Sequence, residues 1–500
     1  MNRAGCLDRG TGRRLLAGAA APLALAIVFA LIFYTCNTPL GAWIGSDNAM
    51  YLTMGTALAK GYAPYTQIFD HKGPLLFALQ MLPQLFAGGY STLAVFVQEM
   101  LFLWACLMVI ARMARRLGAP ALAAQLVYLA LYAPLLDGGN LTEEYANLFT
   151  LFGLEIMCRV FGEREQKKLF LPALAMGAAA TVCFLLRANN MLPLAFAVLA
   201  LAVYLAACGR FKDLGACAAG FASGMALTAL PVIVWLCAHG ALSEAVYGAI
   251  VHNMMYAGTQ GQSRVHMLLH EFYGHDAMLL AALACLGALC ATVRTRSLAI
   301  PSAMVAGALG GGMAAFISHK FYLHYLMLGV PMAALGAMQI FAFIREKKPG
   351  LLRASAVCAA AVCALMLAVT GVRVNAQREA DYAVLEAMTP DAQALYAQVP
   401  EEDRDSFLAY RVEPKWYAVT GALPSMRFYF LQEILADADP AVMDEIVATF
   451  ESNPPRWVVL FYNRPFSPPY DARVQAIFDT RYEFVDARGE YQLLRLREDL

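Results

Sequence analysis

The chain has 500 residues, of which 60% are hydrophobic and 15% charged, and its 37 basic residues equal its 37 acidic residues. A mean hydropathy of +0.55 is too high for a soluble globular protein, so most of the chain must be solvated by lipid. The balanced charge gives no support to nucleic-acid binding, and we expect no nucleic-acid partner. All twelve cysteines precede residue 374, without CxxC spacing, so the polar C-terminal part is expected to lack disulfides.

Apolar runs long enough to cross a bilayer recur up to about residue 372. The first follows Arg13 and Arg14 and ends without a clean cleavage site, so we expect a retained helix and not a signal peptide. A shorter run at 75–88, after Gly73 and Pro74, predicts an interfacial helix. Hydropathy thus predicts about 11 transmembrane helices, at 15–36, 92–111, 119–136, 145–161, 169–186, 191–208, 213–237, 277–293, 298–317, 325–344 and 351–372.

Lysine and arginine cluster in alternate loops, from Arg112 through Arg345. By the positive-inside rule, these loops and the N-terminus face the cytoplasm of a multi-pass protein in the cytoplasmic (inner) membrane. The opposite loops then face outward, including a first outer loop at 37–73 and a long outer loop at 238–276. The outer loops contain scattered acids, histidines and lone cations, and the topology predicts that these converge on one surface.

The composition changes near residue 374, which predicts two domains: a membrane module at 1–373 and an extracytoplasmic soluble α/β domain at 374–500. A helical linker at about 376–398 is expected first. A further helix at 440–452 follows Asp439 and Pro440, which suit a helix start. Strand-like segments are expected near 406–410, 457–462, 482–486 and 490–496.

The first outer loop concentrates groups that could act on a substrate. Asp47 could remove a proton from an acceptor hydroxyl, while cations such as Lys72 stabilise a departing phosphate. Asp47 could instead cap a helix at 48–60, and Asp70 could orient Lys72 or form an ordinary loop ion pair. The candidate binding residues of this loop are Tyr51, Tyr65, Asp70, His71 and Lys72.

Other outer loops add further candidate binding residues. Arg187 stands between two apolar runs, where an unpaired guanidinium would be costly, so it should meet water, an acid or a phosphate. Acids at the start of a helix also suit its dipole, and aromatic or basic residues near a membrane surface also serve as interfacial anchors. These residues are therefore candidates with structural alternatives: Glu143, Glu144, Arg187, Lys320, His324 and Tyr325.

Several outer-loop motifs resemble those of GT-C glycosyltransferases related to glycosyltransferase family 39, which includes protein O-mannosyltransferases and bacterial lipid A aminoarabinose transferases. Asp47 with Tyr51 begins the match. It continues through Gly61-Tyr-Ala-Pro-Tyr65, Asp70-His-Lys-Gly-Pro74, Thr142-Glu-Glu144, Leu186-Arg-Ala-Asn-Asn190 and Lys320-Phe-Tyr-Leu-His-Tyr325. The resemblance covers the membrane part and implies a GT-C-like fold, with weaker motifs in the C-terminal domain.

The resemblance also implies a function. Asp47 would be the catalytic base of an inverting glycosyltransferase, and Lys72 would contact the phosphate of a polyprenyl-phosphate sugar donor. Asn48 replaces the second acid of the O-mannosyltransferase pair, which puts protein acceptors in doubt, and Gly73 replaces a proline. The acceptor remains open among an envelope glycolipid, a polysaccharide and a protein. No cofactor is expected, and divalent-cation assistance is left open.

Other classes of function also fit many helices with few charges. A transporter or lipid flippase is the main alternative, although such proteins place ionisable groups at the bilayer midplane and show repeated halves, which are not visible here. A third interpretation is a non-catalytic envelope scaffold. The long outer loop contains five histidines, which are His239, His252, His266, His270 and His275. They suggest a metal site, but their spacing misses the H-E-x-x-H pattern. A substrate-covering loop is therefore the favoured interpretation.

Overall fold

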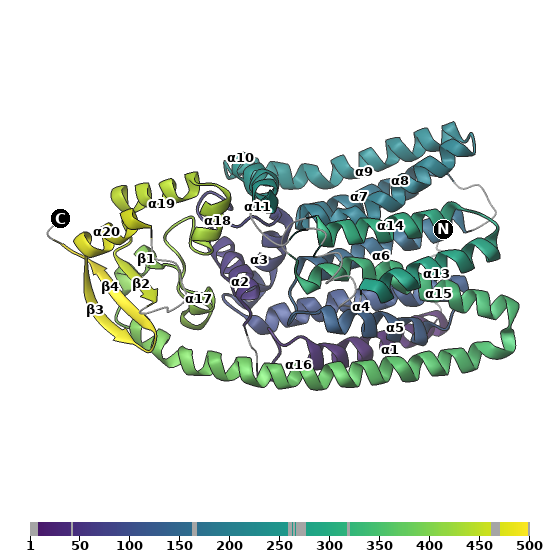
Figure 1. The fold of residues 1–500 in the computed structure, drawn as a ribbon, viewed down its shortest axis with the longest axis horizontal. Coiled ribbons are helices and arrows are strands. Elements are labelled where there is room, and N and C mark those ends of the chain that lie inside the picture. Colours follow the sequence, from purple (N-terminus) through teal and green to yellow (C-terminus); the bar gives the residue numbers. More distant parts are fainter. Residues whose placement is uncertain are drawn as a thin grey trace, which may run out of the picture.

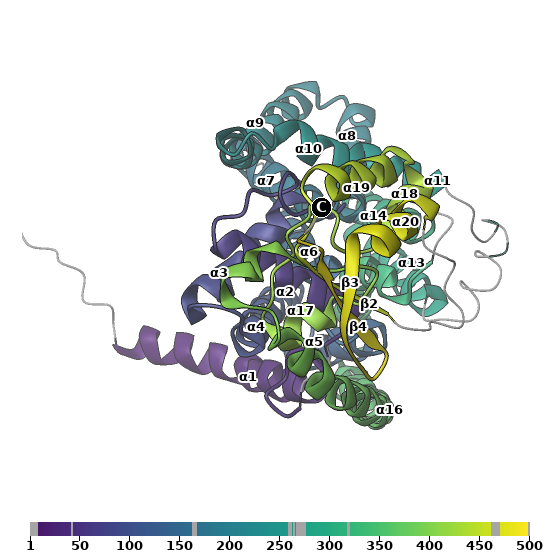
Figure 2. The same cartoon turned by 90° about the vertical axis from the view of Figure 1, so that its left-hand side faces the viewer.

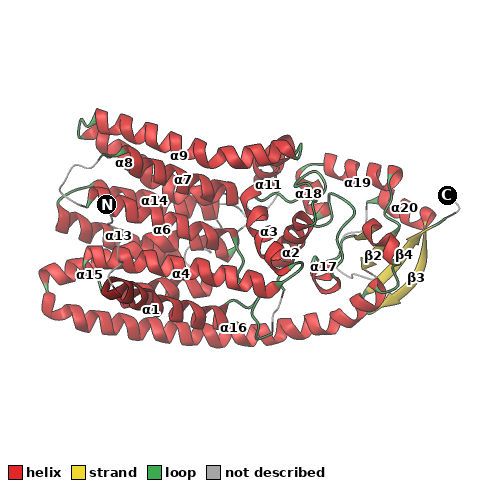
Figure 3. Ribbon diagram, turned by 180° about the vertical axis from the view of Figure 1, so that it is seen from behind, coloured by secondary structure: helices red, strands yellow, loops and turns green. Residues whose placement is uncertain are grey.

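The computed structural model describes residues 9–41, 44–162, 168–258, 263, 266, 277–317, 321–461 and 471–498. The molecule is elongated, with a helical bundle at one end, a small sheet domain at the other and short helices between them (Figure 1). In the described part of the chain, the strands lie at the domain end (Figure 3). Seven of the described helices are long and apolar enough to cross a membrane. The prediction of a polytopic α-helical membrane protein with a C-terminal α/β domain is confirmed.

Each predicted span coincides with one helix of the bundle. The charged residues of α6, including Glu143 and Glu155, lower its hydropathy relative to its neighbours. The helices that coincide with the predicted spans are α1 (Arg9–Phe33), α4 (Thr92–Leu117), α5 (Ala121–Tyr132), α6 (Thr142–Phe161), α7 (Phe170–Leu186), α8 (Leu192–Ala207), α9 (Phe211–Ala238), α13 (Ala277–Thr295), α14 (Ala299–Phe316), α15 (Val330–Lys347) and α16 (Leu352–Tyr396).

Local sequence explains where these helices begin and end. In α4, the Ser91 hydroxyl accepts a hydrogen bond from the backbone N–H of Ala94 at 3.2 Å, which satisfies one free donor of the first turn. The same helix ends at Gly118, whose φ of +75° suits glycine, after two arginines that complement the negative end of the helix dipole. Ordinary capping chemistry thus fixes the ends of a membrane helix.

Small residues allow the bundle helices to approach closely. α13 and α15 meet where Gly287 faces Gly336, and a Cβ at Gly336 would overlap the backbone of Leu283. Lipid tails are as apolar as the side chains they surround, so van der Waals contact at such close approaches is a principal source of helix association.

Short helices lie between the bundle and the C-terminal domain (Figure 1). α3 (Pro74–Ala87) begins with proline at its first turn and, at 14 residues, is too short to span comfortably. It packs against α2 (Ser46–Ala59), which starts in the first outer loop. The long outer loop contributes α10 (Leu242–Val246), a π-helix (Tyr247–His252) and α11 (Asn253–Gly258).

The last predicted span is part of a longer helix. We predicted a span at 351–372 and a separate linker helix at about 376–398, but α16 is one helix of 45 residues. No glycine or proline interrupts residues 372–389, so nothing in the sequence breaks the helix there. The predicted boundary at 373–374 therefore falls inside α16, which runs from the far end of the bundle to the C-terminal domain (Figure 1).

The C-terminal domain contains a four-stranded sheet in the order β1-β2-β4-β3. β1 (Phe407–Ala409) pairs in parallel with β2 (Trp457–Phe461), and the chain between them includes α17 (Lys415–Thr420), α18 (Gln432–Ala438) and α19 (Ala441–Ser452). α20 (Ala472–Arg481) precedes an antiparallel hairpin of β3 (Tyr482–Arg488) and β4 (Tyr491–Leu496). Seen from the domain side, these elements overlie α2, α6 and α14 (Figure 2).

The helix contact at Gly336 gives a prediction about stability. Substituting Gly336→Val should lower the free energy of unfolding by about 1–3 kcal/mol, because the new side chain must push α15 away from α13. The thermal midpoint of the purified protein in detergent measures the effect. Gly312→Val on α14 is the matched control, since a Cβ at Gly312 would meet no atom within 4 Å; equal midpoints for the two variants would contradict the prediction.

Candidate active site

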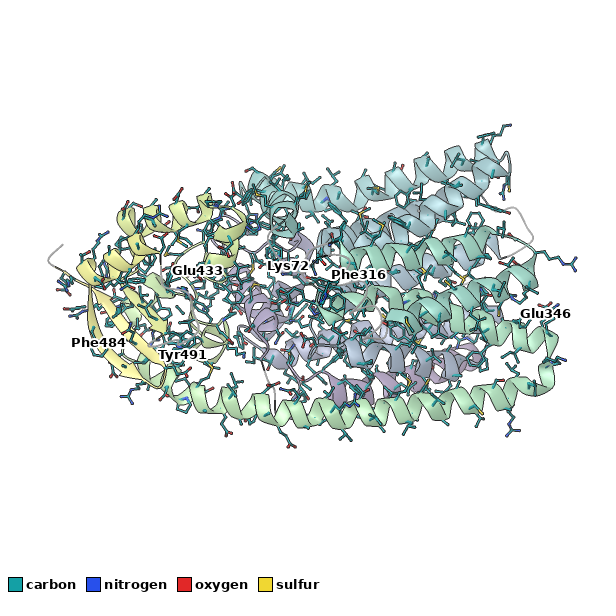
Figure 4. The ribbon with its side chains drawn as sticks, in the orientation of Figure 1. Lys72, Phe316, Glu346, Glu433, Phe484 and Tyr491 are labelled. Carbon is teal, nitrogen blue, oxygen red and sulfur yellow. The ribbon has the colours of Figure 1, made fainter. Side chains whose placement is uncertain are left out.

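A cavity of about 310 Å³ lies where the end of the bundle meets the short helices and the C-terminal domain. Figure 4 shows Lys72 in this region, between Phe316 in the bundle and Glu433 in the domain. The cavity is lined mainly by polar side chains of the outer loops, among them Asp47, Asn48, Tyr51, His71, Lys72, Asp137, Glu143, Arg187, His324 and Tyr325. Predicted site residues from four separate loops therefore meet around one space.

Asp47 presents a free carboxylate to this cavity. It occupies the first turn of α2, and Tyr51 follows one turn later on the same face. The N-cap position belongs to Gly45, and no side chain caps this helix, so the capping alternative finds no hydrogen bond here. Among the described residues, no hydrogen-bond or ion-pair partner of Asp47 occurs, which leaves its carboxylate available to a ligand.

Two buried residues shape the loop that carries Lys72. Tyr65, with φ of +62°, donates a hydrogen bond from its hydroxyl to the Lys72 carbonyl at 2.7 Å. The Asp70 carboxylate accepts from the Lys72 backbone N–H at 2.9 Å. Neither Tyr65 nor Asp70 lines the cavity. Both predicted binding residues therefore support the loop from behind it.

The Lys72 ammonium group lies among three predicted site residues. Its Nζ is 3.2 Å from Nε2 of His71, 3.9 Å from a carboxylate oxygen of Asp70 and 5.9 Å from the ring centroid of Tyr51. Burial lowers the pKa of His71 well below its ordinary value, and the charge of Lys72 lowers it further. A neutral His71 can accept a hydrogen bond from Lys72, so the imidazole orients the ammonium group.

Arg187 joins Glu143 and Tyr325 in a second cluster. Arg187 caps the C-terminal end of α7, donating to Glu143 at 2.9 Å and to the Tyr325 hydroxyl at 2.6 Å. Its guanidinium carbon also lies 4.3 Å from the Tyr325 ring centroid. Both clusters put their cation on the cavity wall, and a guanidinium with five N–H donors retains donors for a ligand after these two bonds.

Three other predicted site residues do not join these clusters. Glu144 is buried away from the cavity and accepts from the Asn140 backbone N–H at 3.0 Å. His324 lines the cavity, with Nδ1 3.9 Å from the exposed carboxylate of Asp137. Lys320 lies outside the described residues, as do His270, Glu271 and His275 of the long outer loop.

The structure adds residues that sequence reasoning missed. Leu431 and Ile434 of the C-terminal domain line the cavity, as does Tyr256 of α11. The domain is held there by hydrogen bonds to backbone carbonyls. The Phe69 N–H donates to the Arg427 carbonyl at 3.0 Å, and the Tyr429 hydroxyl donates to the Met50 carbonyl at 3.2 Å. Such contacts join positions several hundred residues apart and leave no local pattern in the sequence.

An apolar groove of about 690 Å³ adjoins the polar cavity. It is lined by Pro74 and by residues of α7, α9, α10 and the π-helix, including Leu185, Ala188, Ala229 and Val246. Two short segments border both spaces. Residues 71–74 and 185–188 place Lys72 and Arg187 on the polar side, and Pro74, Leu185 and Ala188 on the apolar side.

The two bordering segments are in direct backbone contact. The Gly73 N–H donates to the Leu186 carbonyl at 3.1 Å, and a Cβ at Gly73 would overlap the Leu185 carbonyl. Glycine is therefore required at this position, where the family that the loop motifs resemble has proline. Within the described ranges, no group of three His, Cys, Asp or Glu side chains could hold a metal ion.

No protein-family model matches this sequence, and no curated protein matches it. Among solved structures, the chain is similar to ArnT from Cupriavidus metallidurans bound to undecaprenyl phosphate, with a TM-score of 0.61 and 14% identity, over 94% of this chain and 97% of that chain. ArnT from the same organism in the apo state gives a TM-score of 0.60 and 13% identity, over 95% and 98%. The oligosaccharyltransferase of Archaeoglobus fulgidus, in complex with zinc and sulfate, gives 0.47 and 12%, over 88% and 68%.

The likeness to ArnT extends over almost the whole of both chains, so it includes the C-terminal domain as well as the bundle. The chain therefore has the fold of the GT-C class of membrane glycosyltransferases. This confirms the fold that the loop motifs implied.

The buried His71 gives a prediction about pH. Its pKa is lower in the folded chain than in the unfolded chain, so the unfolded chain binds more protons once the pH falls below about 6.5. The stability that depends on neutral His71 is present above that pH and is lost as the pH falls. Between pH 7 and pH 5 the thermal midpoint should therefore fall more for wild type than for His71→Gln. His239→Gln, at an exposed histidine, is the control and should behave as wild type.

Proposed function

We propose that the protein is an integral membrane glycosyltransferase that transfers a sugar from a polyprenyl-phosphate donor to an acceptor outside the cytoplasm. The observation that carries this proposal is the pair of adjoining spaces, one polar and cationic at its wall, the other apolar. An amphiphile with an anionic head and a long hydrocarbon tail fits such a pair. The structure of ArnT bound to undecaprenyl phosphate supports the proposal, because a protein of this fold holds a lipid of that kind.

The proposed donor lies with its polyprenyl chain in the apolar groove and its phosphate against Lys72 and Arg187. Lys72 uses one N–H toward His71, and its Asp70 contact at 3.9 Å is too long for a hydrogen bond, so two donors remain for the phosphate. Arg187 is held rigidly by Glu143 and Tyr325, so little side-chain entropy is lost on binding.

The proposed reaction is an inverting transfer. Asp47 takes the proton of the acceptor hydroxyl, whose oxygen forms a bond to the anomeric carbon of the sugar. The bond from that carbon to the phosphate oxygen breaks, and the polyprenyl phosphate leaves with the bonding electrons. Negative charge grows on the phosphate in the transition state, where Lys72 and Arg187 stabilise it. Asp47 suits the base because its carboxylate has no protein partner among the described residues.

The proposed orientation follows from charge. The basic last turns of α4 and α15 lie at the bundle end away from the domain, close to Glu346 in Figure 4. The positive-inside rule then assigns that end and the N-terminus to the cytoplasm, and the cavity and C-terminal domain to the outside. The acceptor would be an envelope glycolipid, a polysaccharide or a protein.

The decisive experiment follows release of polyprenyl phosphate from a panel of radiolabelled polyprenyl-phosphate sugars, with protein in nanodiscs and an envelope extract as acceptor source. Asp47→Asn should lower the rate by about a thousandfold or more while donor binding persists. The amide cannot take the proton of the acceptor hydroxyl, so the acceptor oxygen is no longer activated for attack. Asp479→Asn, an exposed acid on α20, is the control. Donor binding without release by wild type would contradict the proposal and favour the transporter or flippase.

The apolar groove gives an independent prediction. Ala229→Trp should fill part of the groove and raise the KM of a long-chain donor by about tenfold. This factor corresponds to the loss of contact for about two methylene groups of the donor chain, at about 0.8 kcal/mol each. A donor with a chain of one or two isoprene units should be affected much less. Leu227→Trp, on the exposed face of the same helix, is the matched control. Equal KM increases for long and short donors would argue against lipid binding in this groove.

A further inference from the structure

A buried network of amides lies directly behind Asp47. Asn48, the next residue of α2, is linked through side chains to the chain after α1, to α3, to α4 and to the loop before α6. All of its members are at most 3% exposed. They are Asn37, Asn48, Gln80, Glu99 and Asn140.

The hydrogen bonds of this network give each amide one orientation. Asn37 and Asn48 bond reciprocally, each Nδ2 donating to the other's Oδ1 at 3.1 Å. Asn140 donates to Asn48 Oδ1 at 2.6 Å, and it bonds reciprocally with Gln80 at 2.6 and 3.1 Å. Asn140 has φ of +59°, a conformation that asparagine tolerates better than most residues.

Glu99 stands at the end of the network, inside the membrane helix α4. Its Oε2 accepts the remaining N–H of Asn37 at 2.9 Å, while Oε1 has no hydrogen-bond partner among the described residues. No described lysine, arginine or histidine pairs with it. A carboxyl group at such a site is costly, so packing alone does not account for it.

The acceptor oxygen of Glu99 determines which way the amides point. Because Asn37 turns its NH₂ toward Glu99, its carbonyl is left to accept from Asn48, and the Asn48 carbonyl then accepts from Asn37 and Asn140. With its side chain held, Asn48 fixes the first turn of α2, where the preceding residue presents its carboxylate to the cavity.

We propose that Glu99 is a positioning residue, which acts through Asn37 and Asn48 to hold Asp47 at the reacting hydroxyl. This inference rests on the proposed function, because it assigns Asp47 the role of base. Glu99 itself does not line the cavity and touches no substrate. Its contribution is to turnover and not to donor binding, since Lys72 and Arg187 lie on other elements.

The test is steady-state donor turnover in nanodiscs by Glu99→Leu, which removes the acceptor and leaves the Asn37 N–H unpaired. We expect kcat to fall about 10- to 100-fold, as for a base misplaced by about 1 Å, with the donor KM within about twofold of wild type. Glu99→Gln, which keeps an acceptor oxygen, should restore most of the rate. Gln125→Leu is the matched control, because Gln125 is a buried amide of α5 that donates to the Leu107 carbonyl and shares no hydrogen bond with the network.

A combined variant separates positioning from general loss of structure. If Glu99 acts through Asp47, Glu99→Leu should have no further effect on the residual rate of Asp47→Asn. An equal loss in both backgrounds, or a kcat no lower than that of Gln125→Leu, would overturn the inference. If Glu99→Leu does not fold, Asn37→Ser, which breaks the same link, replaces it with the same expectations. Unchanged turnover by Asp47→Asn would instead overturn the proposed function, so the two failures are distinguishable.

Discussion

The backbone hydrogen bond from Gly73 to Leu186 is the contact on which the rest of the site depends. It joins the first outer loop to the end of α7, so that Lys72 and Arg187 project to one side and Pro74 and Leu185 to the other. The proposed polyprenyl-phosphate donor needs polar surroundings at its phosphate and apolar surroundings at its chain. The protein achieves this with two short segments, because no side chain intervenes at Gly73.

A buried charge at this boundary is stable only where it is paired or hydrogen-bonded. Arg187 is paired with Glu143, and Lys72 has Asp70 and His71 beside it. Asp47 differs from these groups, since its carboxylate faces the cavity with no partner among the described residues. The site therefore combines two cations, Lys72 and Arg187, that are held in place before any ligand binds with the carboxylate of Asp47, which has no partner among the described residues.

The sequence predicted the bundle well because the spans are long and mainly apolar runs with polar ends. It also predicted that Lys72 and Arg187 would converge, because alternating topology brings outer loops together whatever their separation along the chain. It could not predict Leu431 or Ile434, whose role depends on how a separate domain docks, and no local pattern encodes docking. Glu99 was missed for the opposite reason: one acid inside a long apolar run does not change the hydropathy average, although its buried partners make it distinctive.

The continuous helix α16 also constrains how the cavity can open. At about 1.5 Å per residue its 45 residues span about 68 Å, from the far end of the bundle to the sheet. The C-terminal domain is thus connected to the bundle by a continuous helix and not by a flexible linker. Widening the entrance to the cavity therefore requires α16 to bend or the C-terminal domain to rotate at the end of that helix.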